Sequence, residues 1–343
     1  MIELTEKLCS LCGTSGREDE VRNFIIDEIK DYADKITVDP LGNLIVFKKG
    51  RNSAKKKVML DAHMDEVGFI ITSINSDGTL LFDCVGGINT AVMTGIPVLV
   101  GDKKISGIIG VTPVHLLPAD KRKELPIKST LVIDIGASSK EEAEKYVSLG
   151  DCAYFDSRFV RFGDGFIKGK ALDDRAGCAV LIEMIKKEQP FDLYFSFSVG
   201  EEVGLGMAGT AAYSIAPDYA IVVETTTAAD LAGVDEGHKV CRPGFGGAVS
   251  FMDRRTVYNK NLFNFALDLA KNKNIKLQPK TMVAGGNNAG TIHKTAGGIK
   301  TLAISMPCRY LHSPSCVIKE EDIYSSLEII TALAQEFADD KVN

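Results

Sequence analysis

The chain has no tryptophan and no long apolar run. A glycosidase needs two carboxylates roughly 5 to 9.5 Å apart across a sugar, and the adjacent acids Glu201 and Glu202 suit that arrangement poorly. Without tryptophan there is also no indole on which a sugar ring could stack, so we do not expect a glycosidase. No segment approaches the roughly 20 apolar residues that a membrane-spanning helix needs, and we expect no membrane partner.

Basic residues are outnumbered by acidic ones, 40 to 46. The formal net charge is -6, and we expect the basic clusters at 55–57 and 121–123 in solvated loops, so no nucleic-acid partner is expected. Among eight cysteines only Cys9 and Cys12 have metal-site spacing, and no second pair follows. We expect reduced thiols on an amphipathic helix. Because residues 1–10 alternate charged with apolar side chains, we expect a cytoplasmic protein.

The pattern of apolar runs predicts two domains, as the length of 343 residues also suggests. Periodicity predicts helices at 4–11 and 20–32, then strands at 37–38, 44–47 and 58–62. Further on, glycine-punctuated β-rich runs occur at 69–74, 80–82, 98–100, 105–111 and 131–135, with one short helix at 141–149. We therefore expect a small all-β domain at 67–168, inserted into an α/β domain formed by 1–66 and 169–343.

Helices and strands alternate again in the last half of the chain. Helices are predicted at 174–187, after 204, at 261–271 and at 320–337, and strands at 193–198, 219–223 and 301–305. This alternation predicts an α/β fold in which a mixed, mostly parallel sheet is sandwiched by helices. In such sheets, functional groups gather at the carboxyl ends of the strands.

Five acidic or histidine-bearing segments stand where a β-prone run gives way to a turn. They are His63 with Asp65, Asp173 with Asp174, Glu201 with Glu202, Glu224, and His312. Imidazoles and carboxylates can hold a pair of divalent cations and leave one carboxylate for proton transfer, which is the chemistry of metal-assisted hydrolysis. Their common position carries more weight than any single motif.

The first two segments also have structural interpretations. Asp65 can orient the His63 imidazole if the strand pleat persists, although an isolated histidine is often structural. Asp174 fits the N-cap of the following helix, and Asp173 can project from the loop to bridge two metals. A capping role alone would also explain an acid here.

The remaining segments are similarly open when taken singly. Glu201 and Glu202 repel each other unless a cation or proton intervenes, which favours a metal ligand beside a general base over two solvated loop acids. Glu224 ends the apolar run 220–223, where a buried charge needs a partner. His312, like Glu224, could be an incidental polar residue. We expect His115 and His238 to be structural or exposed, and leave His293 open.

In this order the segments resemble the M42 family of cocatalytic dinuclear metalloaminopeptidases, sometimes labelled glutamyl aminopeptidases or, historically, cellulase M. The resemblance covers nearly the whole chain. The motifs that carry it are DAHMDEVG at 61–68, the segment 107–117 ending in PVHLL, KALDDRAG at 170–177, EEVGL at 201–205 and CRYLHSP at 308–314.

The resemblance implies two divalent metal ions and a role for each segment. His63 and Glu224 would bind one metal, Glu202 and His312 the other, and Asp173 would bridge them. Glu201 would be the general base and Asp65 would steer His63. Zinc is the first expectation for the metal, with cobalt or manganese as alternatives.

The family also implies an architecture and a substrate. The insertion would be a PDZ-like barrel that mediates dimers and, in many members, a hollow tetrahedral dodecamer, so we expect a homo-oligomer. The substrates would be short peptides, which lose their amino-terminal residue at a catalytic domain formed by 1–66 and 169–343.

Two departures from the family pattern stand out. Glu224 occupies a position where aspartate is common, which alters how one metal and the substrate amine are held. The usual GTDA stretch reads GNNA at 286–289, so a negative group that we expect near the cleft is missing.

Two other functions remain open from the sequence. A deacylase or carboxypeptidase-type amidohydrolase can use the same metal centre, and a glutamate at position 224 occurs in such relatives. A non-catalytic metal-binding scaffold is the third possibility. The preferred amino-terminal residue, the metal, and the choice between dimer and dodecamer are not fixed by the sequence.

Overall fold

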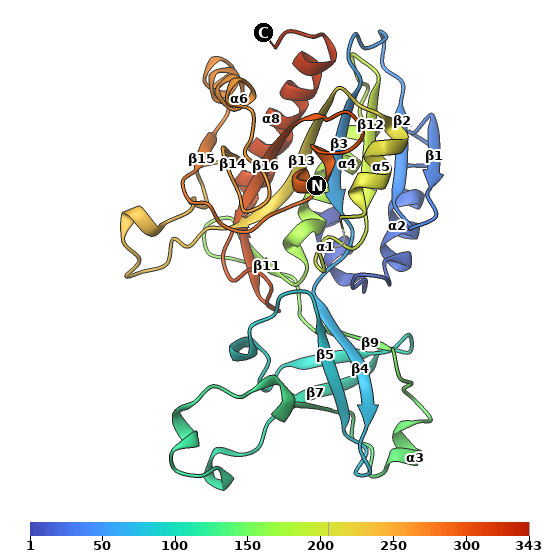
Figure 1. Ribbon diagram of the computed structural model, residues 1–343, viewed down its shortest axis with the longest axis vertical. Coiled ribbons are helices and arrows are strands. Elements are labelled where there is room, and N and C mark those ends of the chain that lie inside the picture. The colour runs from blue at the N-terminus through green and yellow to red at the C-terminus, as the bar shows by residue number, and fades with distance from the viewer. Residues whose placement is uncertain (205, 343) are drawn as a thin grey trace.

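The computed structural model describes residues 1–204 and 206–342 and consists of an α/β domain and a smaller β-barrel (Figure 1). The α/β domain contains an eight-stranded sheet. Its strands, in spatial order, are β1 (Lys35–Val38), β2 (Leu44–Lys48), β12 (Leu193–Ser198), β3 (Val58–His63), β13 (Tyr219–Thr227), β16 (Lys300–Cys308), β14 (Gly247–Ser250) and β15 (Leu277–Lys280).

The four central strands β12, β3, β13 and β16 run parallel to one another. Antiparallel pairing joins β2 to β12 and β14 to β16 on the two flanks, and β15 is parallel to β14. This arrangement confirms the predicted mixed, mostly parallel sheet. Because the central strands are parallel, their carboxyl ends lie at one edge of the sheet, which is where the candidate residues were expected.

Helices cover both faces of the sheet. One face packs against α4 (Leu172–Lys186) and α8 (Glu320–Ala338), and α1 (Ile2–Ser10), α2 (Asp19–Ile29) and α6 (Lys260–Lys273) pack on these two. The other face carries α5 (Ala208–Ile215) and α7 (Ala289–Ile292). All of β3 is buried, as expected for a strand covered on both sides.

The inserted domain is a closed six-stranded barrel with its own core, drawn at the bottom of Figure 1. Its strands, in spatial order, are β4 (Gly68–Ile74), β5 (Leu80–Val85), β8 (Val132–Asp134), β7 (Ile105–Gly110), β6 (Pro97–Val100) and β9 (Cys152–Phe155). Inside it, the ring of Phe69 makes edge contacts with Phe82 and Phe155, at centroid distances of 5.0 and 5.3 Å.

Several short elements were not predicted. These are β9, β14, β15, and a three-stranded sheet of β10 (Val160–Phe162), β11 (Phe166–Gly169) and β17 (Cys316–Lys319). The helix expected at 141–149 is only the short α3 (Lys140–Ala143). Barrel strands end at Phe155, while β10 and β11 join β17 of the α/β domain, so the domain limit at residue 168 stays a prediction.

Two features bear on the compositional expectations. All eight cysteines are free, with Cys9 in α1 and Cys12 just beyond its end. Within the described residues, no helix is both long and apolar enough to cross a membrane.

The barrel core generates a stability prediction. Phe69→Ala should lower the free energy of unfolding by about 3–5 kcal/mol, because it removes a fully buried ring and leaves a cavity. Phe162→Ala is the matched control, since Phe162 is 47% exposed. Chemical denaturation should show a clear loss for the first variant and almost none for the second, and equal losses would contradict this account of the barrel core.

Candidate active site

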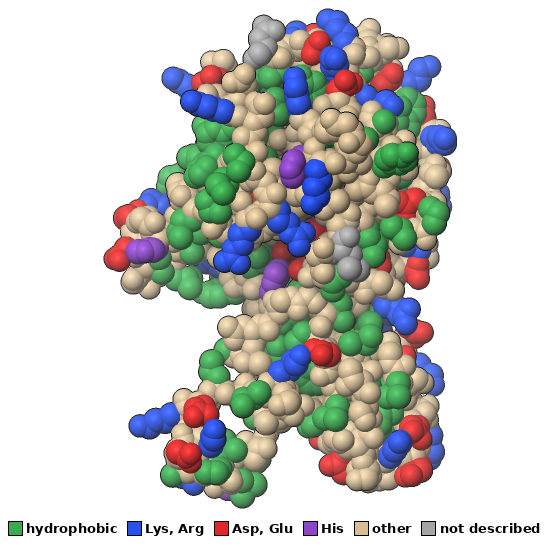
Figure 2. Space-filling model, in the orientation of Figure 1, with side chains coloured by type: hydrophobic (Ala, Val, Ile, Leu, Met, Phe, Trp, Pro, Cys, Tyr) green, Lys and Arg blue, Asp and Glu red, His purple; other side chains and the backbone are tan. Residues whose placement is uncertain are grey.

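All five predicted segments meet in one cleft of the α/β domain beside the barrel. His63 ends β3, Glu201 and Glu202 follow β12, and His312 follows β16. The cleft has a volume of about 410 Å³, and its lining includes Asp173, Glu201, Glu202, Glu224 and His312. Figure 2 looks onto this hollow, in which acidic and histidine side chains are visible between basic ones.

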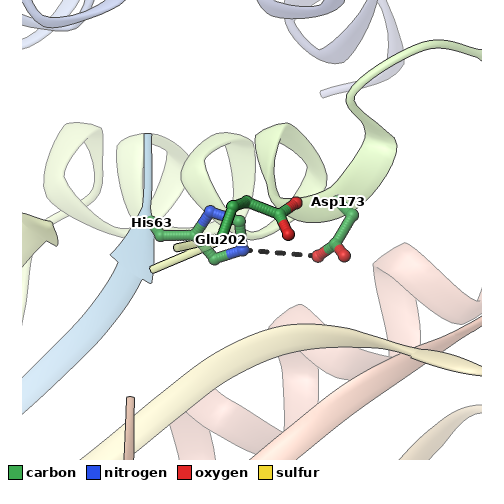
Figure 3. Close-up of side chains that lie close together, drawn as sticks. All are labelled: His63, Asp173 and Glu202. Atoms are coloured by element: carbon green, nitrogen blue, oxygen red, sulfur yellow. Dashed lines mark ion pairs between the residues drawn. The ribbon is translucent and has the colours of Figure 1, made fainter. Parts of the chain in front are cut away.

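Asp173 lies at the centre of the cluster and faces both histidines. Its Oδ1 is 3.4 Å from His63 Nε2, and its Oδ2 is 3.4 Å from His312 Nε2. Glu224 Oε1 lies 3.3 Å from the same nitrogen of His63, and Glu202 Oε2 lies 3.2 Å from that of His312. Figure 3 shows His63, Asp173 and Glu202 pointing toward one another. The cluster thus has two halves that share Asp173.

Both imidazoles are oriented through their other nitrogen. His63 Nδ1 is 3.0 Å from the carbonyl oxygen of Asp65, and His312 Nδ1 is 2.8 Å from that of Gly87 in the inserted domain. Because a carbonyl only accepts, each Nδ1 carries the hydrogen and donates it. In the neutral rings, each Nε2 therefore presents its lone pair to Asp173, which is the orientation that a metal ligand needs.

The donor set fits two divalent cations. Two ligand atoms, each about 2.0–2.1 Å from one tetrahedral ion, lie about 3.3 Å apart, and the nitrogen–oxygen separations within the two halves are 3.2–3.4 Å. Among the described residues, the buried atoms His63 Nε2 and Asp173 Oδ1 find no hydrogen-bond partner. Histidine with carboxylates suits zinc, cobalt and manganese alike.

The buried Asp65 carboxylate connects three parts of the site. It accepts hydrogen bonds from the Ser15 hydroxyl at 2.6 Å and from the backbone amides of Glu201 and Glu202 at 3.1 and 3.0 Å. Its Oδ1 also lies 3.3 Å from His63 Nδ1. Burial raises the pKa of Asp65, but these interactions outweigh it and hold the pKa below its usual value. The sequence predicted only the contact with His63.

The Glu201 carboxyl has an altered pKa. Burial raises it, the nearby His63 opposes the rise, and the negative charges of Asp173 and Asp65 add to it, so that the pKa lies at about 7. A carboxylate with a pKa near neutrality both takes and returns a proton readily. Burial and the charge of Asp173 also raise the pKa of Glu202 well above its usual value.

Asp174 caps the regular part of α4, as predicted, because the backbone at Asp173 and Asp174 is not helical. Its Oδ1 accepts from the Gly177 amide at 3.1 Å, and its Oδ2 accepts from the His63 amide at 3.3 Å. The Asp173–Asp174 peptide bond is cis. Asp174 caps the helix and supports β3, while Asp173 lines the cleft.

Two sequence-based expectations about local structure are wrong. Glu224 does not end its strand, because β13 continues to Thr227 and pairs with β16 throughout. Position 288 does not face the cleft: the buried Asn288 donates to Asp61 Oδ2 and to Ser198 Oγ, both at 2.8 Å. An aspartate at position 288, as in the usual family pattern, would therefore point toward the sheet and not into the cleft.

The other three histidines lie outside the cluster. His115 and His238 are exposed, as expected. His293 is partly buried, and its Nδ1 is 2.6 Å from the Ala289 carbonyl within α7. In the part of the chain that the structure describes, His293 is not among the residues that line the cleft.

A supporting segment, residues 13–18, was missed. Besides the Ser15 contact with Asp65, Glu18 Oε1 accepts from the amides of Gly16 and Gly200, at 2.9 and 3.1 Å, and so holds the residue before Glu201. The sequence indicated only a turn at Gly13 to Gly16. No local pattern could reveal these partners, because Glu18 and Gly200 are far apart along the chain.

A second supporting group is the buried ion cluster around Glu66. Lys170 Nζ donates to Glu66 Oε1 at 2.7 Å, and Arg175 Nη2 lies 3.3 Å from the same oxygen. Arg175 also donates to the Met64 carbonyl at 2.8 Å. This cluster fixes the turn that follows His63.

The fold and the acid-rich cluster define the class of metal-dependent peptide hydrolases with an inserted β-domain. The profile of the M42 glutamyl aminopeptidase family matches residues 42–329. A protein of Acetivibrio thermocellus, provisionally named an aminopeptidase, is 41% identical over 333 residues, which cover 96% of this chain and 97% of that protein.

Solved structures of similar proteins are also aminopeptidases or peptidases. A TET aminopeptidase from a marine sediment archaeon of the Thaumarchaeota superposes with a TM-score of 0.95 at 35% identity, covering 99% of this chain and 97% of that chain. A TET1 peptidase of Pyrococcus horikoshii, which can assemble into a tetrahedron or a large octahedral shell, gives 0.87 at 35% identity, covering 98% and 99%. The chain belongs to the M42 family and is a peptidase of the aminopeptidase type.

The hydrogen bond between Ser15 and Asp65 generates a prediction. Ser15→Ala should lower kcat about tenfold while KM and metal content change little, because a charge-assisted hydrogen bond that fixes the Glu201 loop is lost. Ser10→Ala is the control, since the exposed Ser10 hydroxyl only donates to Lys7 in α1. Steady-state kinetics with metal analysis would decide, and an unchanged kcat in Ser15→Ala would refute the positioning role.

Proposed function

We propose that this protein removes amino-terminal residues from short peptides at a dinuclear metal centre, with Glu201 as the general base. The observation that supports this most is the placement of Asp173, which offers one carboxylate oxygen to each histidine. His63 and Glu224 would hold one ion, Glu202 and His312 the other, and Asp173 would bridge them.

The protein's own groups would handle the protons. When bound, two divalent cations supply Lewis acidity, which polarises a carbonyl group and makes water a stronger acid. Glu201 takes the proton of the attacking water and returns it to the leaving amine. Asp65 keeps the Glu201 backbone and the His63 ring in place for this step.

The acidic character of the cleft favours a free amino terminus. Glu202 and Glu224 lie beside Asp173, so a peptide's free α-amino group at this end of the cleft would lie next to the ions and their carboxylate ligands. An acetylated amino terminus has no basic nitrogen to place there. The deacylase and carboxypeptidase-type alternative rests on Glu224 alone, and the scaffold alternative requires that the protein hydrolyse nothing.

We also propose that residues 67–168 form an inserted association domain and that 1–66 with 169–343 form the catalytic domain. The barrel carries an arm between β7 and β8 on which Val114, Leu116, Leu125 and Ile127 are 60–66% exposed. Exposed apolar side chains at this density are characteristic of protein interfaces. The shell formed by the Pyrococcus horikoshii relative supports a homo-oligomer.

Replacement of the general base should separate metal binding from turnover. Glu201→Gln should retain two equivalents of metal and lose activity by at least about 100-fold, because it removes the proton acceptor without changing the ligands. Glu183→Gln, on the outer part of α4, is a control with the same chemical change. The assay uses aminoacyl anilides and their acetylated forms on protein stripped of metal and reloaded with zinc, cobalt or manganese.

The outcomes of that assay separate the candidate functions. Metal-dependent cleavage of free-amine substrates alone supports the aminopeptidase. Cleavage of blocked substrates alone supports the deacylase, and cleavage of neither kind supports the scaffold. Full activity of Glu201→Gln would remove Glu201 from its proposed role.

The exposed apolar side chains of the arm between β7 and β8 predict that copies of the protein associate through this arm. Leu116→Asp with Ile127→Asp should shift the protein to smaller species in analytical ultracentrifugation, because two charges would have to be buried in the contact. Lys121→Asp, in an exposed turn of the same arm, is the control for a charge change outside the apolar side chains. A monomeric wild-type protein would contradict the proposal.

A further inference from the structure

A further carboxylate lies one layer beneath the metal-binding cluster. Asp61 and His63 are two residues apart on β3, so their side chains leave the same face of the sheet, about 7 Å apart along the strand. Both are buried, and they pair with Ser196 and Ser198 of the neighbouring strand β12. The face of the sheet that carries the proposed metal ligand His63 therefore continues inward to a buried acid.

The Asp61 carboxylate connects three elements around the site. Asn288, the residue before α7, donates from its amide nitrogen to Asp61 Oδ2 and to Ser198 Oγ, both at 2.8 Å. The Ser198 hydroxyl donates in turn to the same oxygen of Asp61 at 3.3 Å. Ser198 ends β12, three residues before Glu201. The position of the carboxylate is thus fixed from β12 and from α7.

Asp61 has neutral partners only. Its hydrogen-bond donors are an amide and a hydroxyl, and within the described chain no lysine or arginine forms an ion pair with it. Such donors offset part of the cost of burying a carboxylate but leave its charge uncompensated. Asp61 interacts through space with His63. Its electric field therefore reaches the place where His63 would hold an ion.

Asn288 is the residue that allows this charge. An aspartate at position 288 would lie in contact with Asp61, and two carboxylates that share one buried position cannot both ionise readily. Asparagine avoids the conflict, because its amide nitrogen only donates. The negative charge that the family pattern led us to expect at position 288 lies one hydrogen bond away, on Asp61.

We propose that Asp61 strengthens the binding of the metal ion held by His63, through the charge of its carboxylate and not as a ligand. The inference rests on the proposed dinuclear centre. Among the described residues Asp61 is not part of the cleft lining, so its carboxylate acts from behind the ligands. Attraction between opposite charges is strong in a protein interior, because little water lies between them to weaken it.

The first test removes the charge and keeps the shape. Asp61→Asn should weaken the binding of one of two zinc equivalents by about 10- to 100-fold, as expected for a unit charge and a divalent ion about 7–9 Å apart near a wet cleft. The measurement is competition between metal-stripped protein and a chromogenic chelator. Asp268→Asn, on the exposed side of α6, is the control with the same chemical change and should bind zinc like the wild type.

The second test returns the charge across the hydrogen bond. In Asp61→Asn with Asn288→Asp, the new asparagine can donate to the new aspartate, and the Ser198 hydroxyl can serve both, since it donates and accepts. The carboxylate moves by about one hydrogen-bond length, so the zinc Kd should return to within about threefold of the wild type. Chemical denaturation of the metal-free variants shows whether each is folded.

Each outcome decides the inference. An unchanged zinc affinity in Asp61→Asn overturns it. If the exchanged pair folds but binds zinc as weakly as Asp61→Asn, the charge is not the cause, and the inference also fails. Because the readout is metal affinity, zinc binding with the expected pattern but without hydrolysis supports this inference and contradicts the aminopeptidase proposal. A wild-type protein that binds no zinc overturns the dinuclear centre and this inference together.

Discussion

The Asp65 carboxylate is the acceptor on which the geometry of the active site depends. It is fully buried and accepts one hydrogen bond from a hydroxyl of the 13–18 segment and two from backbone amides of the loop that carries Glu201. A buried anion in such a position is tolerated only because several donors surround it. Each donor would cost about 1–3 kcal/mol if it were left unpaired in the interior. The segments that meet at Asp65 are therefore held in a single relative position.

Adjacent acids serve opposite sides of this arrangement. Asp65 faces the site, whereas Glu66 turns away and pairs with Lys170 and Arg175. Arg175 also donates to the carbonyls of Met64 and Leu8, which connects the turn after β3 to the first helix. The turn after β3 thus lies between the acidic cleft and the ion cluster of Glu66, Lys170 and Arg175, and its backbone is fixed from both sides.

Much of this architecture was predictable from the sequence for identifiable reasons. The strands β3, β12, β13 and β16 are apolar runs rich in β-formers, and α4 and α8 have clear helical periodicity. Parallel strands bring their carboxyl ends to one edge, and for that reason widely separated acids and histidines could be expected together.

The elements that were missed lack such signals. β15 reads LQPK, which has no apolar alternation, so the strand was not visible in the sequence. The end of β13 was misplaced because the apolar residues stop at Val223, while β-branched threonines continue the strand along the cleft. The partners of Asp65 and the direction of Asn288 depend on contacts between segments as much as 227 positions apart.

The bond from His312 to the Gly87 carbonyl gives the barrel a part in the chemistry of its host domain. A descendant that lost the insertion would retain every acid and histidine of the cleft but not the acceptor that sets one imidazole's tautomer. Gly86 lies against Val67 and Glu202 with a φ of 89°, where a Cβ atom would come within 2.7 Å of the valine. Exposed positions of the barrel can change without touching the cleft, whereas a change in this short stretch must be accompanied by a change in the cleft residues that it contacts.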